Sequence, residues 1–163
     1  GDTIILDTGT TTLELAKRLK EKKNITAVVN DLEIARCLER FDSVNIVFLG
    51  GSIRKHFHCT VGPAGLKMLS ELTVDKAIMA TNGLSLLKGA TTPDISQAEI
   101  KKTMISIANK VIILCDNSKI GKNSFAQFAS VQQLDTLITD SIEDDIRKEF
   151  EINGVEILTP HDG

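Results

Sequence analysis

GDTIILDTGTTTLELAKRL, residues 1–19, places a strand, a polar loop and a helix in direct succession. The apolar run Thr3–Leu6 predicts a buried strand, and the spacing of Leu13, Ala16 and Leu19 predicts a helix with one apolar face. Between them, residues 7–12 (DTGTTT) contain an acid, a glycine and four threonine hydroxyls. A strand followed directly by a helix is the repeating unit of α/β folds.

The same alternation continues along the chain. Six more short runs, several of them continuously apolar and rich in Ile and Val, predict strands covered on both faces at 26–29, 45–49, 76–80, 111–115, 136–139 and 156–158. We therefore expect an α/β fold with an open, mostly parallel sheet and helices on both faces. No repeat, linker or low-complexity tract divides the sequence, so residues 1–163 are expected to form a single domain.

The last helix of this pattern has a well-marked sequence. Ile142, Ile146 and Phe150 recur at four-residue spacing, which predicts one apolar stripe. Asp140 or Ser141 is the expected N-cap, and an Asn-Gly pair at 153–154 is the expected end.

Composition restricts the class of protein. The chain has 163 residues, 42% apolar and 25% charged, which is typical of a soluble globular domain. The net charge of −3 argues against a general affinity for nucleic acid or anionic membranes. No apolar run is long enough for a membrane span, and no signal peptide is recognisable. Three cysteines without close pairing, with Cys115 at the end of a buried run, favour a reducing cytoplasm.

The loop of residues 7–12 has two interpretations. A glycine and several hydroxyls at a helix N-terminus suit a bound phosphate, because the unpaired N–H groups and the helix dipole favour an anion there. The alternative is structural: Thr11 and Glu14 have the spacing of a capping box, which needs no ligand. The capping box leaves Asp7 and Gly9 without a role. No Gly-Lys-Thr follows, so this is not a Walker A loop.

Two more loops after strands carry candidate ligand-binding residues. The DNSK segment at 116–119 includes a lysine that could meet a phosphate or sugar oxygen, although Asp and Asn also shape ordinary turns. The segment 80–102 has a polar loop with Lys88 and Asp94, which could form a lid, followed by a second capping-box pattern from Ser96 to Glu99.

The HFHC segment at 56–59 suggests a metal site only weakly. His56 and His58 would project from one face of an extended segment, and no matched second pair of ligands lies nearby in the sequence. No serine or cysteine lies in a recognisable nucleophile turn. We expect no metal, no cofactor and no catalytic residues.

Taken together, the loops resemble those of a known family. TIILDTGTTT, VVND, LGG, VDKAIMATNGLSLLKGATTPDISQAEIKKTMI, VIILCDNSKIG and LDTLITD resemble, in order and spacing, the C-terminal sensor domain of DeoR-type bacterial transcriptional regulators. The resemblance implies a fold of the ribose-5-phosphate isomerase/CoA-transferase type, related also to glucosamine-6-phosphate deaminase. It implies a phosphorylated sugar as effector and a homo-oligomer. It also implies operator DNA bound through an N-terminal helix-turn-helix domain that this chain lacks.

The resemblance also suggests site residues and argues against catalysis. Asn82 and Gly83 stand where the isomerase has acids, while Lys88 and Glu99 are similar in position to residues of its active site. Asn cannot take the proton that an isomerase must move. The expected function is that of a sensor domain in a repressor of sugar-metabolism genes, which binds its ligand without turnover; the alternative is a phosphosugar isomerase or deaminase. The expected ligand-binding residues are Asp7, Thr8, Gly9, Thr10, Thr11, Thr12, Asn30, Gly51, Asn82, Gly83, Lys88, Asp94, Glu99, Asp116, Ser118 and Lys119.

Overall fold

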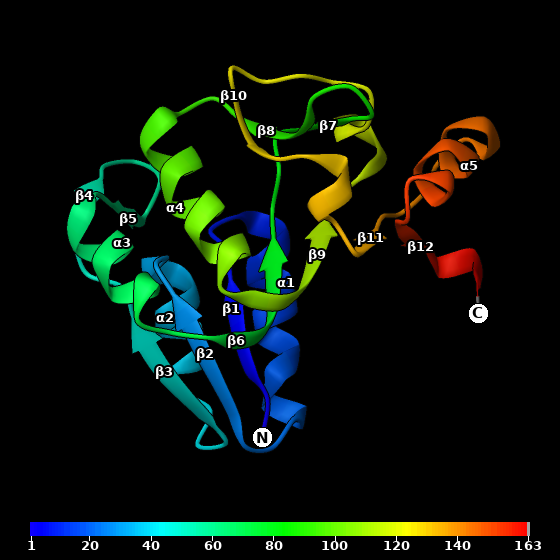
Figure 1. The fold of residues 1–163 in the computed structure, drawn as a ribbon. Coiled ribbons are helices and arrows are strands. Elements are labelled where there is room, and N and C mark those ends of the chain that lie inside the picture. The colour runs from blue at the N-terminus through cyan, green and yellow to red at the C-terminus, as the bar shows by residue number, and fades with distance from the viewer. Residues whose placement is uncertain (163) are drawn as a thin grey trace.

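The computed structural model describes residues 1–162 and contains a central sheet of seven strands, all parallel. Each predicted strand segment corresponds to one strand of this sheet, with bounds that shift by no more than a few residues (Figure 1). The α/β prediction is therefore confirmed. The seven strands are β1 (Thr3–Leu6), β2 (Ile25–Val29), β3 (Val44–Phe48), β6 (Val74–Met79), β9 (Ala108–Leu114), β11 (Thr136–Ile138) and β12 (Glu156–Leu158).

The order of the strands creates a switch point beside β1. Across the sheet the order is β12-β11-β9-β6-β1-β2-β3. The chain therefore builds outward from β1 to β3, then returns to the other side of β1 and continues from β6 to β12. In open α/β sheets, ligands bind outside the carboxyl ends of the strands where the order reverses, which here lies between β1 and β6.

Helices cover both faces of the sheet, as expected. Ile4 and Leu6 pack with α1 (Thr10–Arg18) and α2 (Leu32–Leu38) on one face. Ile5, which points to the opposite face because side chains alternate along a strand, packs with α3 (Pro63–Ser70) and α4 (Ile95–Ser106). A further helix, α5 (Asp144–Ile152), contacts β12 at one end of the molecule.

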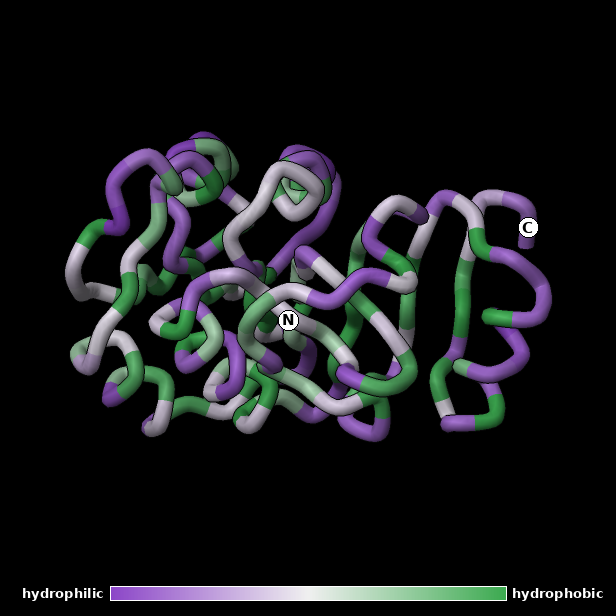
Figure 2. Tube along the Cα trace, turned by 90° about the horizontal axis from the view of Figure 1, so that it is seen from above, coloured by the Kyte–Doolittle hydropathy of each residue, from purple (hydrophilic) through white to green (hydrophobic). Residues whose placement is uncertain are grey.

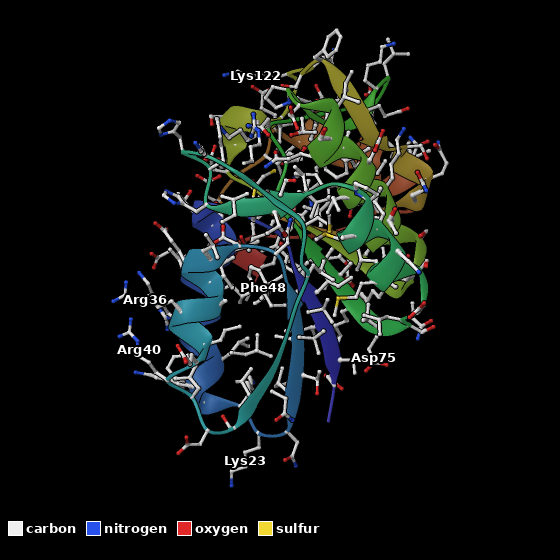
Figure 3. The ribbon with its side chains drawn as sticks, turned by 90° about the vertical axis from the view of Figure 1, so that its left-hand side faces the viewer. Lys23, Arg36, Arg40, Phe48, Asp75 and Lys122 are labelled. Atoms are coloured by element: carbon white, nitrogen blue, oxygen red, sulfur yellow. The ribbon has the colours of Figure 1, made fainter. Side chains whose placement is uncertain are left out.

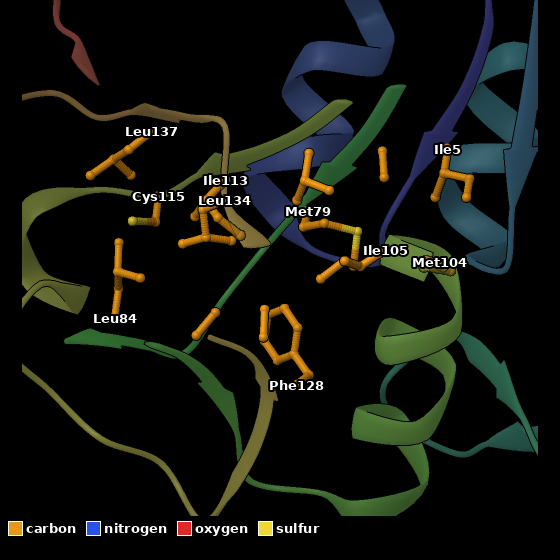
Figure 4. Packing of buried hydrophobic residues seen from close by; sticks show 14 of the residues in the cluster. Ile5, Met79, Leu84, Met104, Ile105, Ile113, Cys115, Phe128, Leu134 and Leu137 are labelled. Atoms are coloured by element: carbon orange, nitrogen blue, oxygen red, sulfur yellow. The ribbon is translucent and has the colours of Figure 1, made fainter. Parts of the chain in front are cut away.

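The larger core lies between the sheet and α4. Figure 4 shows Phe128 lying between α4 and the strands that carry Met79 and Ile113. The tube in Figure 2 alternates between hydrophobic and hydrophilic stretches along the helices, as elements with one buried face do. Figure 3 shows exposed side chains: Arg36 of α2 and Arg40, in the turn after this helix, both point away from the core.

Two small antiparallel sheets lie above the carboxyl edge, where the sequence indicated only loops. One pairs β7 (Gly83–Ser85) and β8 (Gly89–Thr92) with β10 (Ala126–Ala129); the other is the hairpin of β4 (Ser52–Arg54) and β5 (Cys59–Val61). These strands have three or four residues, too few for a periodic signal, and β10 is distant in sequence from β8. Four short 3₁₀ turns complete the structure: η1 (Leu19–Glu21), η2 (Asn117–Lys119), η3 (Val131–Gln133) and η4 (Pro160–Asp162).

Three helices begin at other residues than the capping patterns in the sequence suggested. α1 begins at Thr10 with Gly9 as N-cap, so Thr11 and Glu14 do not form a capping box, and Glu14 instead pairs with Lys17 at 2.8 Å. α4 begins at Ile95, and the Asp94 carboxylate accepts a hydrogen bond from the Gln97 N–H at 2.9 Å, which excludes the capping box of residues 96–99.

The third is the start of α5. The N-cap of α5 is Glu143, not Asp140 or Ser141. The Asp140 carboxylate accepts from the backbone N–H groups of Asn117 and Ser141 at 2.7 and 2.9 Å. Asp140, one of the two expected N-caps, therefore binds the loop after β9 and does not cap α5.

Candidate functional site

A cleft of about 340 Å³ lies at the carboxyl edge of the sheet, over the switch point. Loops after β9, β6, β1 and β2 line it, together with the tip of the β4–β5 hairpin. Seven of the sequence-predicted ligand residues are in this lining, and the structure brings them together from three loops: Thr8, Gly9, Thr10, Thr11, Asn82, Asp116 and Lys119.

The first turn of α1 forms one wall. Thr10 and Thr11 are exposed there, and within the described residues no side chain caps the helix. The Thr12 hydroxyl is buried and donates back to the Gly9 carbonyl at 3.0 Å, so it stabilises the turn from inside. A residue with a Cβ at position 9 would approach the Ala80 Cβ to 3.1 Å, and Gly9 has a φ of 155°. The free N–H groups of this turn are therefore available to an anion.

Asp7 lies beneath the cleft instead of in its wall. Its side chain is 1% exposed and pairs with Lys101 of α4, whose side chain is 4% exposed, at 2.5 Å. The Asp7 carboxylate also accepts from the backbone N–H groups of Thr8 at 2.9 Å and Ala80 at 3.1 Å. Burial raises the pKa of Asp7 above its usual value, while Lys101 and these two N–H groups oppose that rise.

Lys101 is the principal residue that the sequence analysis missed. Its ammonium group also donates to the Ala80 carbonyl at 2.9 Å and lies 4.9 Å from the centre of the Phe128 ring, and the side chain reaches the cleft. A signal was available in the sequence. Lys101 lies three residues after Ala98 and three before Met104, so it interrupts the buried face of α4. A lysine is almost never buried without a partner.

A chain of hydrogen bonds connects the loops around the cleft. The Thr8 hydroxyl donates to Asp31 at 2.5 Å, and the other Asp31 oxygen caps α2 by accepting from the N–H groups of Glu33 and Ile34. Asp31 lines the cleft, and the sequence analysis did not select it. The loops after β6, β1 and β2 are therefore tied together through Asp7, Thr8 and Asp31.

The loop after β9 is shaped by its own acid. The Asp116 carboxylate accepts from both the N–H and the hydroxyl of Ser118, and these hydrogen bonds hold the pKa of Asp116 below its usual value. Ser118 is exposed outside the lining, whereas Lys119 is half-buried within it. Asp116 therefore remains ionised and forms the η2 turn that carries Lys119.

The remaining predicted residues lie outside the lining. Asn30 is buried and donates to the Thr60 carbonyl at 2.8 Å, and its Oδ1 has no hydrogen-bond partner within the described residues. Gly51 precedes β4, and a Cβ there would meet the Val61 carbonyl at 2.5 Å. Gly83 begins β7, where a Cβ would meet the Lys122 carbonyl, also at 2.5 Å.

Three more candidates also lie outside the lining. Lys88 is exposed in the turn between β7 and β8, and Glu99 is exposed on α4. Asp94 caps α4, and its carboxylate lies 3.8 Å from the Arg54 guanidinium. The structure does not bring these three into the cleft beside Lys119.

The cysteines are free and buried, as predicted for Cys115. Burial raises the pKa of the Cys115 thiol to about 12, and burial also raises the pKa of Cys59. Residues 1–162 contain no group of three or more His, Cys, Asp or Glu side chains arranged to hold a metal ion. None of the helices in this range is long and apolar enough to cross a membrane.

Comparison with known proteins identifies the family of the chain. Residues 1–141 match the family described as the DeoR C terminal sensor domain. The chain belongs to this family. It is 34% identical over 159 residues to the HTH-type transcriptional regulator GlpR of Haloferax volcanii, covering 97% of this chain and 62% of that protein. It is 35% identical over 159 residues to the HTH-type transcriptional repressor GlcR of Bacillus subtilis, covering 97% and 61%.

The DeoR sensor domain also resembles a solved enzyme fold. Ribose 5-phosphate isomerase A of Methanocaldococcus jannaschii superposes with a TM-score of 0.51 at 17% identity, over 74% of this chain and 47% of that one. Identity at this level indicates a shared fold only. The chain spans about three fifths of the length of the curated relatives named above.

Proposed function

We propose that this sensor domain binds a phosphorylated sugar in the cleft and holds it without chemical change. The uncapped first turn of α1 is the observation that carries the proposal, because its N–H groups and dipole suit a phosphate. Lys119 supplies a cation in the same lining. The hydroxyls of Thr10 and Thr11 add donors beside it.

A binding measurement with paired ligands tests the proposal. Purified protein is titrated with phosphorylated hexoses, pentoses and glycerol phosphate, and with the matching free sugars. We expect tighter binding of phosphorylated forms, with stabilisation of about 2.7 kcal/mol at one hundred times the dissociation constant. That corresponds to roughly 5–10 °C in melting temperature for a domain of this size.

Two lysine variants sharpen the test. Lys119→Ala should weaken the phosphorylated ligand selectively, because it removes a cation from the lining. Lys122→Ala is the matched control: Lys122 is three residues away, exposed and outside the lining (Figure 3). Equal effects of both variants, or equal loss for phosphorylated and free sugars, would contradict the assigned role of Lys119.

Sensing without turnover is supported by the acids around the cleft. Asp31 already accepts hydrogen bonds from the Thr8 hydroxyl and the Glu33 N–H, and Asp116 accepts from the Ser118 N–H of its own loop. Asn82 donates and accepts hydrogen bonds but does not move protons near neutral pH. Glu33 is the lining carboxylate most available to act as a base, and it lies 3.5 Å from the His58 imidazole. Aldose–ketose interconversion by the protein that disappears in Glu33→Gln would overturn this proposal and favour an isomerase.

The relatives support a wider role as part of a DNA-binding regulator. The two relatives named above are a helix-turn-helix transcriptional regulator and a helix-turn-helix transcriptional repressor, and both are longer than this chain. We propose that the intact protein is a cytoplasmic homo-oligomer that contacts operator DNA through a separate helix-turn-helix domain. A ligand would control it only by binding two arrangements of the protein with different affinities. Operator binding by the intact regulator, measured with and without a sugar phosphate, tests this coupling.

A further inference from the structure

The tip of the β4–β5 hairpin, residues 55–58, has an unusual conformation. His56 and His58 both have positive φ, 72° and 59°, which non-glycine residues seldom adopt. Both imidazoles and the Phe57 ring line the cleft, although these three residues are exposed. The ring of Phe57 stacks on the Arg54 guanidinium, 3.6 Å from its centre. These three side chains are exposed and add little to the core, yet all three residues line the cleft.

The hairpin is held firmly where it meets the rest of the site. The Leu32 N–H at the start of α2 donates to the His58 carbonyl at 2.7 Å. The Thr60 N–H donates to the Asn30 carbonyl at 2.9 Å, and the Gln97 amide of α4 donates to the Cys59 sulfur at 3.1 Å. In Figure 3 the hairpin lies above the amino end of α2. These contacts fix the position of the tip relative to the cleft.

The groups that could bind a phosphate lie toward one side of the cleft, although Asp116 is on the same loop as Lys119. Lys119 follows β9, and α1 begins after β1, so the groups suited to an anion lie between these two strands. Glu33 and the hairpin follow β2 and β3, on the other side of β1. Strands lie about 4.8 Å apart, so the ends of β1 and β3 are separated by roughly 10 Å. A phosphate at α1 therefore leaves the hairpin tip beside the remainder of the ligand.

We infer that the hairpin tip is the specificity-determining wall of the cleft. His56 and His58, with Glu33 beside His58, form hydrogen bonds with hydroxyl groups of the sugar at the end away from the phosphate. Phe57 covers an apolar face of the sugar, as aromatic side chains in small-molecule sites do. This inference rests on the proposed function, and it separates two tasks: α1 and Lys119 bind the phosphate, and the hairpin tip distinguishes between sugars.

The positive φ angles allow a well-controlled experiment. His56→Gly and His58→Gly delete the imidazoles without straining the backbone, because glycine adopts positive φ freely. Phe57→Ala removes the ring. Lys55→Ala is the matched control, since Lys55 is an exposed residue of the same tip that lies outside the lining. The probes are inorganic phosphate, glucose 6-phosphate, mannose 6-phosphate, fructose 6-phosphate, ribose 5-phosphate and glycerol 3-phosphate, with dissociation constants from calorimetry.

We expect the tip variants to reduce the differences between sugar phosphates. The sugar phosphate that the unmodified protein binds most tightly should lose about tenfold in affinity, the effect of one hydrogen bond at the strong end of its range. Inorganic phosphate should change less than twofold, and Lys55→Ala should change neither.

Two results would overturn the inference while leaving the proposed function intact. One is an unchanged ranking of sugar phosphates in all three tip variants. The other is an equal loss for inorganic phosphate and every sugar phosphate, which would mean that the tip supports the anion site. Failure of the proposed function has a different signature: the unmodified protein would bind none of the six probes, or Lys119→Ala would leave them all unaffected.

Discussion

At the scale of single residues, the buried pair of Asp7 and Lys101 organises the site. Two opposite charges placed side by side under the cleft connect β1 to α4 and fix the start of the Thr8 loop. A buried ion pair contributes little to stability compared with an apolar replacement, but losing one partner leaves an uncompensated charge. Removing one partner should therefore cost more stability than the intact pair contributes relative to an apolar replacement.

Lys101→Met tests this reasoning. The variant keeps the length and packing of the side chain but leaves Asp7 buried without its cation, so we expect a loss of about 3–5 kcal/mol in the free energy of unfolding. The double variant Asp7→Asn/Lys101→Met should recover part of that loss, because no charge remains buried. Urea unfolding of the three proteins measures both effects. A loss below about 1 kcal/mol in Lys101→Met would contradict the pairing.

The buried thiols give a prediction about reactivity and pH. With the pKa of Cys115 at about 12, roughly one thiol in ten thousand is ionised at pH 8. Only the thiolate reacts with a disulfide reagent, and its share grows as pH rises toward the pKa. We expect Cys59 and Cys115 to react slowly with such a reagent in the native protein and rapidly after unfolding in guanidinium chloride. Rapid modification of Cys115 at pH 8, located by mass spectrometry, would contradict this prediction. It would show that the carboxyl edge of the sheet at Cys115 is accessible to the reagent.

At the scale of elements, α1, α2 and α4 all begin near the cleft, but their N-termini are capped differently. α2 and α4 are capped by the carboxylates of Asp31 and Asp94, whereas α1 begins at Gly9 with no side-chain cap in the described residues. A capped helix has satisfied N–H groups and little need for a ligand. The contrast is why we assign the anion to α1.

Asp94→Ala tests the cap of α4. Its carboxylate accepts from Gln97, so the substitution should cost about 1 kcal/mol of stability, within the usual range for caps of about 0.5–2. Asp94→Asn is the control, since asparagine is an equally good N-cap, and it should retain most of that energy. Thermal or urea unfolding compares the two. A similar loss in both variants would assign the effect to the Arg54 contact at 3.8 Å instead.

At the scale of the whole molecule, the reversal of strand order beside β1 creates the cleft. Because β6 returns next to β1, the loops after both strands face each other, and Asp7 and Ala80 form a direct hydrogen bond. The fold is shared with ribose 5-phosphate isomerase A, while the curated relatives are regulators. The shared fold therefore does not decide between catalysis and sensing, because function depends on the side chains placed on the fold.

Net charge leads to a prediction for the molecule as a whole. With a net charge of −3, these 163 residues carry no net positive charge to attract DNA, and contacts to the phosphate backbone supply much of DNA affinity. We expect no sequence-selective binding of an operator duplex by this chain alone at physiological salt. Gel-shift and anisotropy measurements would check this, with the intact regulator as positive control. Retention at sub-micromolar concentration would assign a DNA contact to the sensor domain.

The sequence alone determined the sheet and one wall of the site. Hydrophobic periodicity depends only on residues that are close in sequence, and it indicates which face of an element is buried. All seven strands of the central sheet were therefore predictable, as was the loop that leads from Thr3–Leu6 into α1. The family resemblance carried by the loop motifs was also readable before any coordinates, and the family match over residues 1–141 confirms it.

Only the tertiary structure decided which side chains meet. Asp7 was expected at the ligand, yet it is two residues after Ile5 and so points to the α4 side, where Lys101 pairs with it. The hairpin tip at residues 55–58 had no assigned role, because its place over the cleft depends on contacts with α2 and α4 that are distant in sequence. Local patterns specify which face of an element is buried, whereas the order of the strands specifies which loops become neighbours.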